Sequence, residues 1–269
     1  GVRLRGRLLV ASVAGEEDGG LGTLALLERG YRADGAVITE PTDLRVVTAQ
    51  AGSYMFRLTV EGKAAHGSVR EEGASAIEKF WPLFEALRGL EADRNSAGGG
   101  ELYASYRLPW PIEVGTLRAG EWASSVPGLL VCEGRCGIAV GEDPRAAREA
   151  LEQAVARAAA ADPWLRDHPP RVQWWGGRFD PAVTDPDDPL VGAVRGAARD
   201  VTGAAPPLEG VTYGSDLRLL VNVGGIPAVL FGPGDVRVAH MADEYVPLDQ
   251  LRVAAEALVV AAVRFCGAG

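Results

Sequence analysis

Apolar and polar blocks alternate along the first forty residues in a way that predicts a strand, a helix and a second strand. Residues 8–13 (LLVASV) are almost all apolar, as expected for a parallel strand that is covered on both faces. Residues 21–29 carry leucines at helical spacing, and Gly30 suits a helix C-cap. Residues 36–39 form a second apolar run. This order predicts a right-handed βαβ unit with parallel strands.

The pattern changes at residues 53–62, where apolar and polar side chains alternate with a period of two. Such alternation predicts an antiparallel strand with one face in water. Further elements are expected at 74–90 (helix, with Pro82 predicting a kink or a late start), 112–117 and 129–140 (strands), 146–161 (helix) and 171–175 (strand). The order β-α-β-β-α-β is the split βαβ pattern. We therefore expect an inserted ferredoxin-like domain over residues 53–176, with a four-stranded antiparallel sheet.

After residue 176 the pattern returns to that of the first segment. Helices are expected at 189–201, 217–221 and 248–265, and a buried strand at 226–231. Residues 1–52 and 177–269 are therefore assigned to one α/β domain into which the other is inserted.

Several acidic residues follow the expected strands. Glu16 and Glu17 follow the first strand, Glu40 follows the second, and His240 lies in a loop after residues 226–231. Open α/β sheets bind ligands at the carboxyl ends of their strands, and carboxylates with an imidazole suit Zn²⁺ or a similar divalent ion. The alternative is an acidic surface loop with no ligand.

Composition narrows the possible functions. With 269 residues, 47% of them hydrophobic and 23% charged, the chain is typical of a globular protein with one large or two ordinary domains. A net charge of -9 disfavours nucleic acid as a partner. No apolar run approaches the ~20 residues that span a bilayer, and no signal-peptide pattern or secretory cysteine framework is present. We expect a cytoplasmic protein without a membrane partner.

Five segments occur in an order that resembles metallopeptidase family M20: GEEDGGLG, ITEPT, AAHGS, YGSDLR and FGPGDVRVAHMADEYVP. The resemblance covers essentially the whole chain. The family contains acetylornithine deacetylase, succinyl-diaminopimelate desuccinylase, carboxypeptidase G2 and aminoacylases, and the last segment is most similar to the acetylornithine deacetylase-like deacylases. The resemblance implies a mixed-sheet, zinc-peptidase-like catalytic α/β domain, and an inserted domain that serves for dimerisation.

The resemblance also implies roles for individual residues. Glu16 is similar to the general base, Glu17 and His240 to the ligands of one metal, and Glu40 to a ligand of a second metal. The metals are expected to be two Zn²⁺ ions per complete site, with Co²⁺ or Mn²⁺ as alternatives.

Three residues of the inserted domain match family positions that act on the substrate. His66 resembles the histidine given to the opposite subunit's site in a homodimer. Arg135 resembles the arginine that holds a substrate carboxylate. Ser124 stands where the family has a substrate-binding asparagine, so its side chain is shorter.

The family's amino-terminal segment, HxDxVP followed by a bridging aspartate, has no match in this sequence, and no histidine precedes His66. We expect one metal to keep Glu17 and His240 and the other to keep only Glu40. The chain alone is therefore expected to be nearly inactive, with exposed apolar surface around residues 8–13.

The implied activity is that of a metal-dependent amidohydrolase, which deacylates an N-acyl amino acid or cleaves a related dipeptide-like amide. One alternative is a non-catalytic fragment or dimerising module of such an enzyme. A serine hydrolase using Ser215 is disfavoured, because the segment lacks the GxSxG elbow. Asp216 and Arg218 are expected to pair with one another at a helix start.

Overall fold

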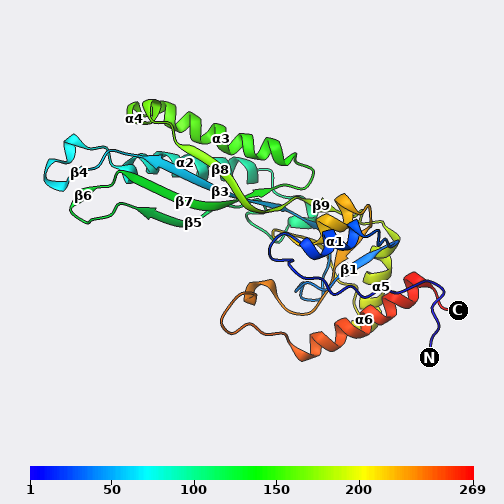
Figure 1. Cartoon of the computed structure of the whole chain (residues 1–269). Helices are drawn as coiled ribbons and strands as arrows, with labels where there is room; N and C mark the ends of the chain where they lie inside the picture. Colours follow the sequence, from blue (N-terminus) through cyan, green and yellow to red (C-terminus); the bar gives the residue numbers. More distant parts are fainter. The chain divides into compact units, whose positions relative to one another are not determined.

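The computed structural model describes residues 1–269, and these divide into two compact units. Unit 1 comprises Gly1–Gln50, Glu101–Tyr103 and Pro181–Gly269, whereas unit 2 comprises Ala51–Gly100 and Ala104–Asp180. Both combine helices with a sheet (Figure 1), which confirms the α/β class. None of the helices has both the length and the apolar composition that crossing a bilayer requires.

Unit 1 is built on a mixed five-stranded sheet. Its strands run in the order β1-β11-β2-β10, and β9 also pairs with β2. The pairs β1–β11 and β2–β10 are parallel, whereas β11–β2 is antiparallel. The elements are α1 (Leu21–Glu28), β1 (Ala36–Ile38), β2 (Val46–Gln50), a 3₁₀ turn (Glu101–Tyr103), β9 (Ala182–Val183), α5 (Pro189–Thr202), β10 (Leu208–Val211), a π-helix (Leu219–Val223), β11 (Ala228–Leu230), a second 3₁₀ turn (Val236–Val238) and α6 (Leu248–Cys266).

One face of this sheet is covered by α5 and α6. Val46, Val229 and Phe231 pack there against Val194 and Ala257, all of them buried. The two ends of the chain meet beside this layer, because Leu4 forms an antiparallel bridge with Ala268 (Figure 1).

The strand predicted at residues 8–13 is absent, so the first βαβ unit is not formed as expected. The segment has no strand assignment, and Leu8 and Val10 are 58% and 91% exposed. An apolar run becomes a strand only where a neighbouring strand satisfies its N–H and C=O groups, and no strand pairs with this one. The parallel neighbour of β1 is instead β11.

Unit 2 contains a four-stranded antiparallel sheet in the order β5-β7-β3-β8. The elements are β3 (Gly52–Glu61), β4 (Ala65–His66), a 3₁₀ segment (Gly67–Glu72), α2 (Ala76–Asn95), β5 (Ile112–Ala119), β6 (Ser125–Val126), β7 (Leu129–Ile138), α3 (Pro144–Ala161), α4 (Pro163–Asp167) and β8 (Arg171–Phe179). The alternation in β3 has the expected consequence, because Phe56 and Leu58 are fully buried while Met55 is exposed. The buried face packs on Leu83 of α2 and Leu151 of α3.

Helix α2 is longer than predicted. It continues through Pro82 to Asn95, with the Ser75 hydroxyl accepting the Glu78 N–H as an N-cap. Two of its large apolar side chains also remain accessible to solvent, because Ile77 and Trp81 are 49% and 62% exposed. Helix α2 therefore presents a partly apolar outer face.

Candidate metal-binding and catalytic site

The acidic loop, residues 14–20, is a tight turn that leads into α1. The amide of Gly19 donates to Glu16 O at 2.9 Å, and the amide of Gly20 donates to Gly15 O at 2.9 Å. Both glycines have positive φ angles, 98° and 75°, which side chains other than glycine rarely adopt. The turn therefore fixes the backbone that carries Glu16 and Glu17.

Glu17 and His240 contact each other directly. The Glu17 Oε1 atom lies 2.9 Å from His240 Nε2, and both side chains are about three-quarters exposed, at 74% and 75%. His240 has a φ of 63°, and its amide donates to Glu244 Oε2 at 3.0 Å. The hydrogen bond that the Glu17 carboxylate accepts from His240 is the main reason why the pKa of His240 is raised. A carboxylate and an imidazole that were predicted to share a metal are thus side by side.

Glu16 and Glu40 are less exposed and lie in a strongly negative environment. Burial, followed by the charges of Glu40, Asp216 and Glu17, raises the pKa of Glu16 to about 7, while the charge of Arg218 opposes the shift. Burial, then Asp216 and Glu17, also raises the pKa of Glu40. Such crowding favours either a bound cation or a bound proton. A carboxylate that titrates near neutrality suits a general base.

The chemistry of these donors fits a divalent ion, although they do not form a complete site. Carboxylate oxygens and an imidazole nitrogen are suitable ligands for Zn²⁺, and Glu17 and His240 provide two adjacent ones. The chain contains no group of three or more His, Cys, Asp and Glu side chains placed to hold a metal ion. Since a catalytic zinc generally has three protein ligands, the Glu17–His240 pair accounts for part of such a site.

Asp216 and Arg218, which were expected to pair with one another, each make a contact with the acidic loop or with α1. Asp216 Oδ2 accepts the Thr23 hydroxyl at 2.5 Å, and Arg218 Nη2 donates to Gly19 O at 2.6 Å. The Asp216 contact therefore reaches α1, and the Arg218 contact reaches the acidic loop. Sequence analysis missed this connection and Thr23 altogether, although the YGSDLR segment was already part of the family match.

Ser215 is unsuited to the role of a nucleophile. Its side chain is fully buried, its hydroxyl donates to Gln50 Oε1 at 2.6 Å, and it accepts the Leu217 amide at 3.2 Å. A hydroxyl without access to solvent cannot meet a substrate, so the structure gives the serine-hydrolase alternative no support.

In unit 2, His66 and Ser124 lie next to each other at a small two-stranded sheet formed by β4 and β6. Strands β4 and β6 pair His66 with Ser125, and the Gly67 amide donates to Ser124 O at 2.8 Å. His66 is exposed, and its Nδ1 accepts the Ser68 amide at 3.2 Å. An Nδ1 that accepts leaves Nε2 as the protonated nitrogen of the neutral ring.

Arg135 lies on the face of the four-stranded sheet opposite to α2 and α3. In strand register it is opposite Glu113 of β5 and Met55 of β3. It is partly buried, and burial lowers the pKa of its guanidinium. His66 and Ser124 are at the two-stranded β4–β6 sheet, whereas Arg135 is on the four-stranded sheet, so the three unit 2 residues belong to two different sheets.

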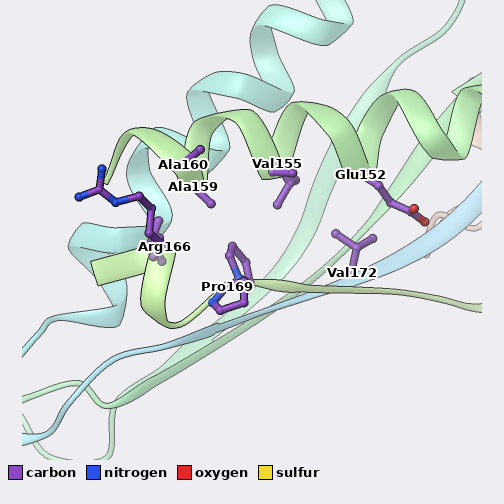
Figure 2. A pocket seen from close by; sticks show the side chains of 10 residues that line it. Glu152, Val155, Ala159, Ala160, Arg166, Pro169 and Val172 are labelled. Atoms are coloured by element: carbon purple, nitrogen blue, oxygen red, sulfur yellow. The ribbon is translucent and has the colours of Figure 1, made fainter. Parts of the chain in front are cut away.

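Unit 2 contains two clefts. The first has a volume of about 420 Å³. It is lined mainly by alanine, valine and proline side chains from α3 and from the segment that enters β8 (Figure 2). Its Glu152 accepts the Trp174 indole N–H at 2.7 Å, so it offers little chemistry. A wider cleft of about 1000 Å³ is bordered by Gly67, Ser124 and Lys79.

Comparison with known proteins agrees with these features. Residues 1–264 match the profile of peptidase family M20/M25/M40. The chain is 33% identical over 271 residues to an acetylornithine deacetylase of Myxococcus xanthus, covering 98% of this chain and 67% of the relative. It is 29% identical over 275 residues to an N-formyl-4-amino-5-aminomethyl-2-methylpyrimidine deformylase of Halalkalibacterium halodurans. This match covers 93% of this chain and 62% of that relative.

Solved structures share the fold. A tripeptidase from Staphylococcus aureus superposes with a TM-score of 0.72 at 19% identity, over 94% of this chain and 62% of the other. An M20 family metallo-carboxypeptidase from Sulfolobus solfataricus superposes with a TM-score of 0.69 at 15% identity, over 94% of this chain and 69% of the other. The chain thus spans roughly two thirds of the length of the proteins that it matches. With the acidic loop, the Glu17–His240 contact and a match over residues 1–264, this chain belongs to peptidase family M20/M25/M40.

Proposed function

We propose that the protein containing this chain is a metal-dependent amide hydrolase that removes the acyl group from an N-acyl amino acid. The observation that carries the proposal is the direct contact of Glu17 with His240, beside the half-buried Glu16 and Glu40. The relative from Myxococcus xanthus is called an acetylornithine deacetylase, which supports an acetylated amino acid as the first substrate to test.

In this proposal, unit 1 supplies the metal ligands and the base. Glu17 and His240 hold one divalent ion and Glu40 holds a second, with Zn²⁺ as the first candidate and Co²⁺ or Mn²⁺ as alternatives. When bound, such ions supply Lewis acidity toward a water and an amide carbonyl. Glu16 takes the proton of the attacking water and returns it to the leaving amine.

Unit 2 supplies groups that orient the substrate. The protonated Nε2 of His66, which the Ser68 contact favours, is suited to donate to the carbonyl oxygen as negative charge develops there. Arg135 holds the substrate carboxylate through its planar guanidinium, and Ser124 adds a shorter hydrogen-bonding group. We further propose a homodimer in which His66 serves the site of the partner subunit.

The test is an assay of the natural protein with N-acetyl-L-ornithine and with a dipeptide, after metal analysis and after chelation. His240→Ala should abolish metal-dependent turnover. The matched control is His168→Ala, because His168 stacks on the Trp164 ring at 3.9 Å between centroids and has no proposed role. Turnover that survives both chelation and His240→Ala would reject the proposal. Retention of dimerisation without any hydrolysis would favour a non-catalytic dimerising module.

A further inference from the structure

The acidic loop is connected to a distant part of the chain by two hydrogen bonds. Asp216 accepts the hydroxyl of Thr23, in the first turn of α1, at 2.5 Å, and Arg218 donates to the carbonyl of Gly19 at 2.6 Å. Thr23 and Asp216 are only 5% and 4% exposed. Buried hydrogen bonds to a charged group contribute more than ordinary ones, and they are costly to break.

Asp216 and Arg218 are called the anchor of the loop here, and Gly20 lies against Asp216. A Cβ atom at this position would be 2.1 Å from Asp216 Oδ1 and 2.6 Å from Leu219 Cδ1. Since real Cβ atoms do not approach other heavy atoms so closely, the loop backbone reaches the Asp216 carboxylate only because residue 20 is glycine. The Oδ1 atom itself has no hydrogen-bond partner. A buried carboxylate oxygen of this kind is unfavourable for folding and is more typical of functional sites.

The anchor is itself attached to the central sheet of unit 1. The Ser215 amide and hydroxyl both donate to Gln50 Oε1, at 3.1 and 2.6 Å. Gln50 ends β2 and is fully buried. The connection therefore runs from a buried strand through Ser215 to Asp216, and from there to the loop.

We propose that Asp216 and Arg218 are positioning residues that fix the backbone of the acidic loop, and thereby aim the side chains of Glu16 and Glu17. Support of this kind around metal ligands keeps them oriented for binding. The expected effect on turnover rests on the proposed function, whereas the expected order of the loop does not.

Hydrogen–deuterium exchange of the 269-residue chain tests the proposal. The amides of Gly19, Gly20 and Gly22 donate within the loop, so they report its order. Thr23→Val removes the hydroxyl at nearly constant volume, and Arg218→Met removes the guanidinium. Each should raise exchange in peptides covering residues 14–22 by about tenfold or more. Thr23→Ser, which keeps the hydroxyl, should restore most of the protection.

Two control variants remove similar groups elsewhere in unit 1. Thr184→Val deletes a buried hydroxyl that donates to Ala228 O at 2.6 Å, and Arg195→Met deletes a guanidinium that donates to Pro206 O at 2.8 Å. Neither should raise exchange in residues 14–22 selectively. If Thr23→Val and Arg218→Met also leave that exchange unchanged, the inference is wrong.

Kinetics of the natural protein provide a second measurement. Thr23→Val should lower kcat while changing KM by less than about threefold, because a misdirected Glu16 impairs proton transfer more than substrate binding. If the wild-type protein hydrolyses none of the substrates, the proposed function is wrong, and hydrogen–deuterium exchange of residues 14–22 alone tests whether Asp216 and Arg218 fix the loop. Active variants with unchanged exchange would reject the anchor and leave the proposed function standing.

Discussion

Glu17 and His240 are separated by 223 residues in the chain, yet their side chains meet at 2.9 Å. The contact joins the loop before α1 to the segment that follows β11. A carboxylate, which is negative when deprotonated, and an imidazole, which is positive when protonated, are thereby held together on an exposed surface. A divalent cation can take the place of the proton that they share.

The first prediction concerns these two side chains as ligands. Glu17→Ala and His240→Ala should each weaken Zn²⁺ binding by tenfold or more, because each deletes a direct ligand. Calorimetric titration of zinc measures the effect, and Asp18→Ala is the control from the same loop. If Asp18→Ala weakened binding as much as Glu17→Ala, the assignment of the ligand would be wrong.

The second prediction separates the base from the ligands. Glu16→Gln should keep the bound metal but reduce turnover by about 10²- to 10⁴-fold, as is common when a general base is removed. Metal content and kcat are measured on the same preparation of the natural protein. Loss of the metal in Glu16→Gln, with its retention in Glu17→Ala, would reverse the two roles.

The third prediction concerns Gly20. Gly20→Ala should destabilise unit 1 by roughly 2–4 kcal/mol, because the φ of 75° is strained for alanine and the new methyl group meets Asp216. Gly30→Ala is the control, since its φ is 84° but no atom lies within 4 Å of the added Cβ. It should cost only about 1 kcal/mol. Thermal unfolding followed by calorimetry compares the two, and equal losses would contradict the close approach.

The fourth prediction is a loss of stability of unit 2 at alkaline pH. Burial raises the pKa values of Cys132 and Cys136 from 9.0 to about 11. Unfolded thiols ionise from about pH 9, whereas the folded ones remain protonated until about pH 11. Their contribution is therefore fully present below pH 9 and is lost as the pH rises to 11, by up to about 2–3 kcal/mol per thiol.

All six tryptophans lie in unit 2, so tryptophan fluorescence during urea unfolding reports on this unit alone. The urea midpoint should fall between pH 9 and 11, and it should fall less in Cys132→Ala. An identical pH dependence in the variant would show that the thiol does not contribute.

The fifth prediction concerns self-association through unit 2. Trp81 and Ile77 expose apolar surface on α2, and Trp81→Asp should convert the expected dimer to a monomer in sedimentation. Val259→Asp in α6 is the matched control, because Val259 is 66% exposed in unit 1. The control should leave the dimer intact. A wild-type protein that is monomeric and active would contradict the dimer.

The regularly patterned elements were predictable from sequence. Strand β3 followed from strict alternation. Helix α5 lies where a helix was expected at 189–201, and the Asp188 carboxylate accepts the Leu190 amide at its start. Strand β2 was missed because its buried residues include Thr48 and Gln50, whose polarity obscures a central strand. Residues 8–13 were wrongly predicted because apolar composition does not reveal whether a partner strand is present.

The candidate site was predictable only as a set of residue types. Sequence placed Glu16, Glu17, Glu40 and His240 after strands. The strand expected before Glu16 and Glu17 is absent, yet Glu17 contacts His240. The partners of Asp216 and Arg218 were not predictable, because a contact with Thr23 across 193 residues leaves no local periodic signal.

Glu17 and His240 lie far apart in the sequence, and this distance affects how the site forms in the newly synthesised protein. Ribosomes add about 5–20 residues per second, so the 223 residues between Glu17 and His240 require about 11 to 45 s. The acidic loop lacks its imidazole partner throughout this interval, and it lacks Asp216 for most of it. Apart from the short 101–103 turn, unit 2 is contiguous from 51 to 180 and emerges before residues 181–269 of unit 1. We therefore expect the nascent chain to complete the inserted unit before the metal ligands can assemble.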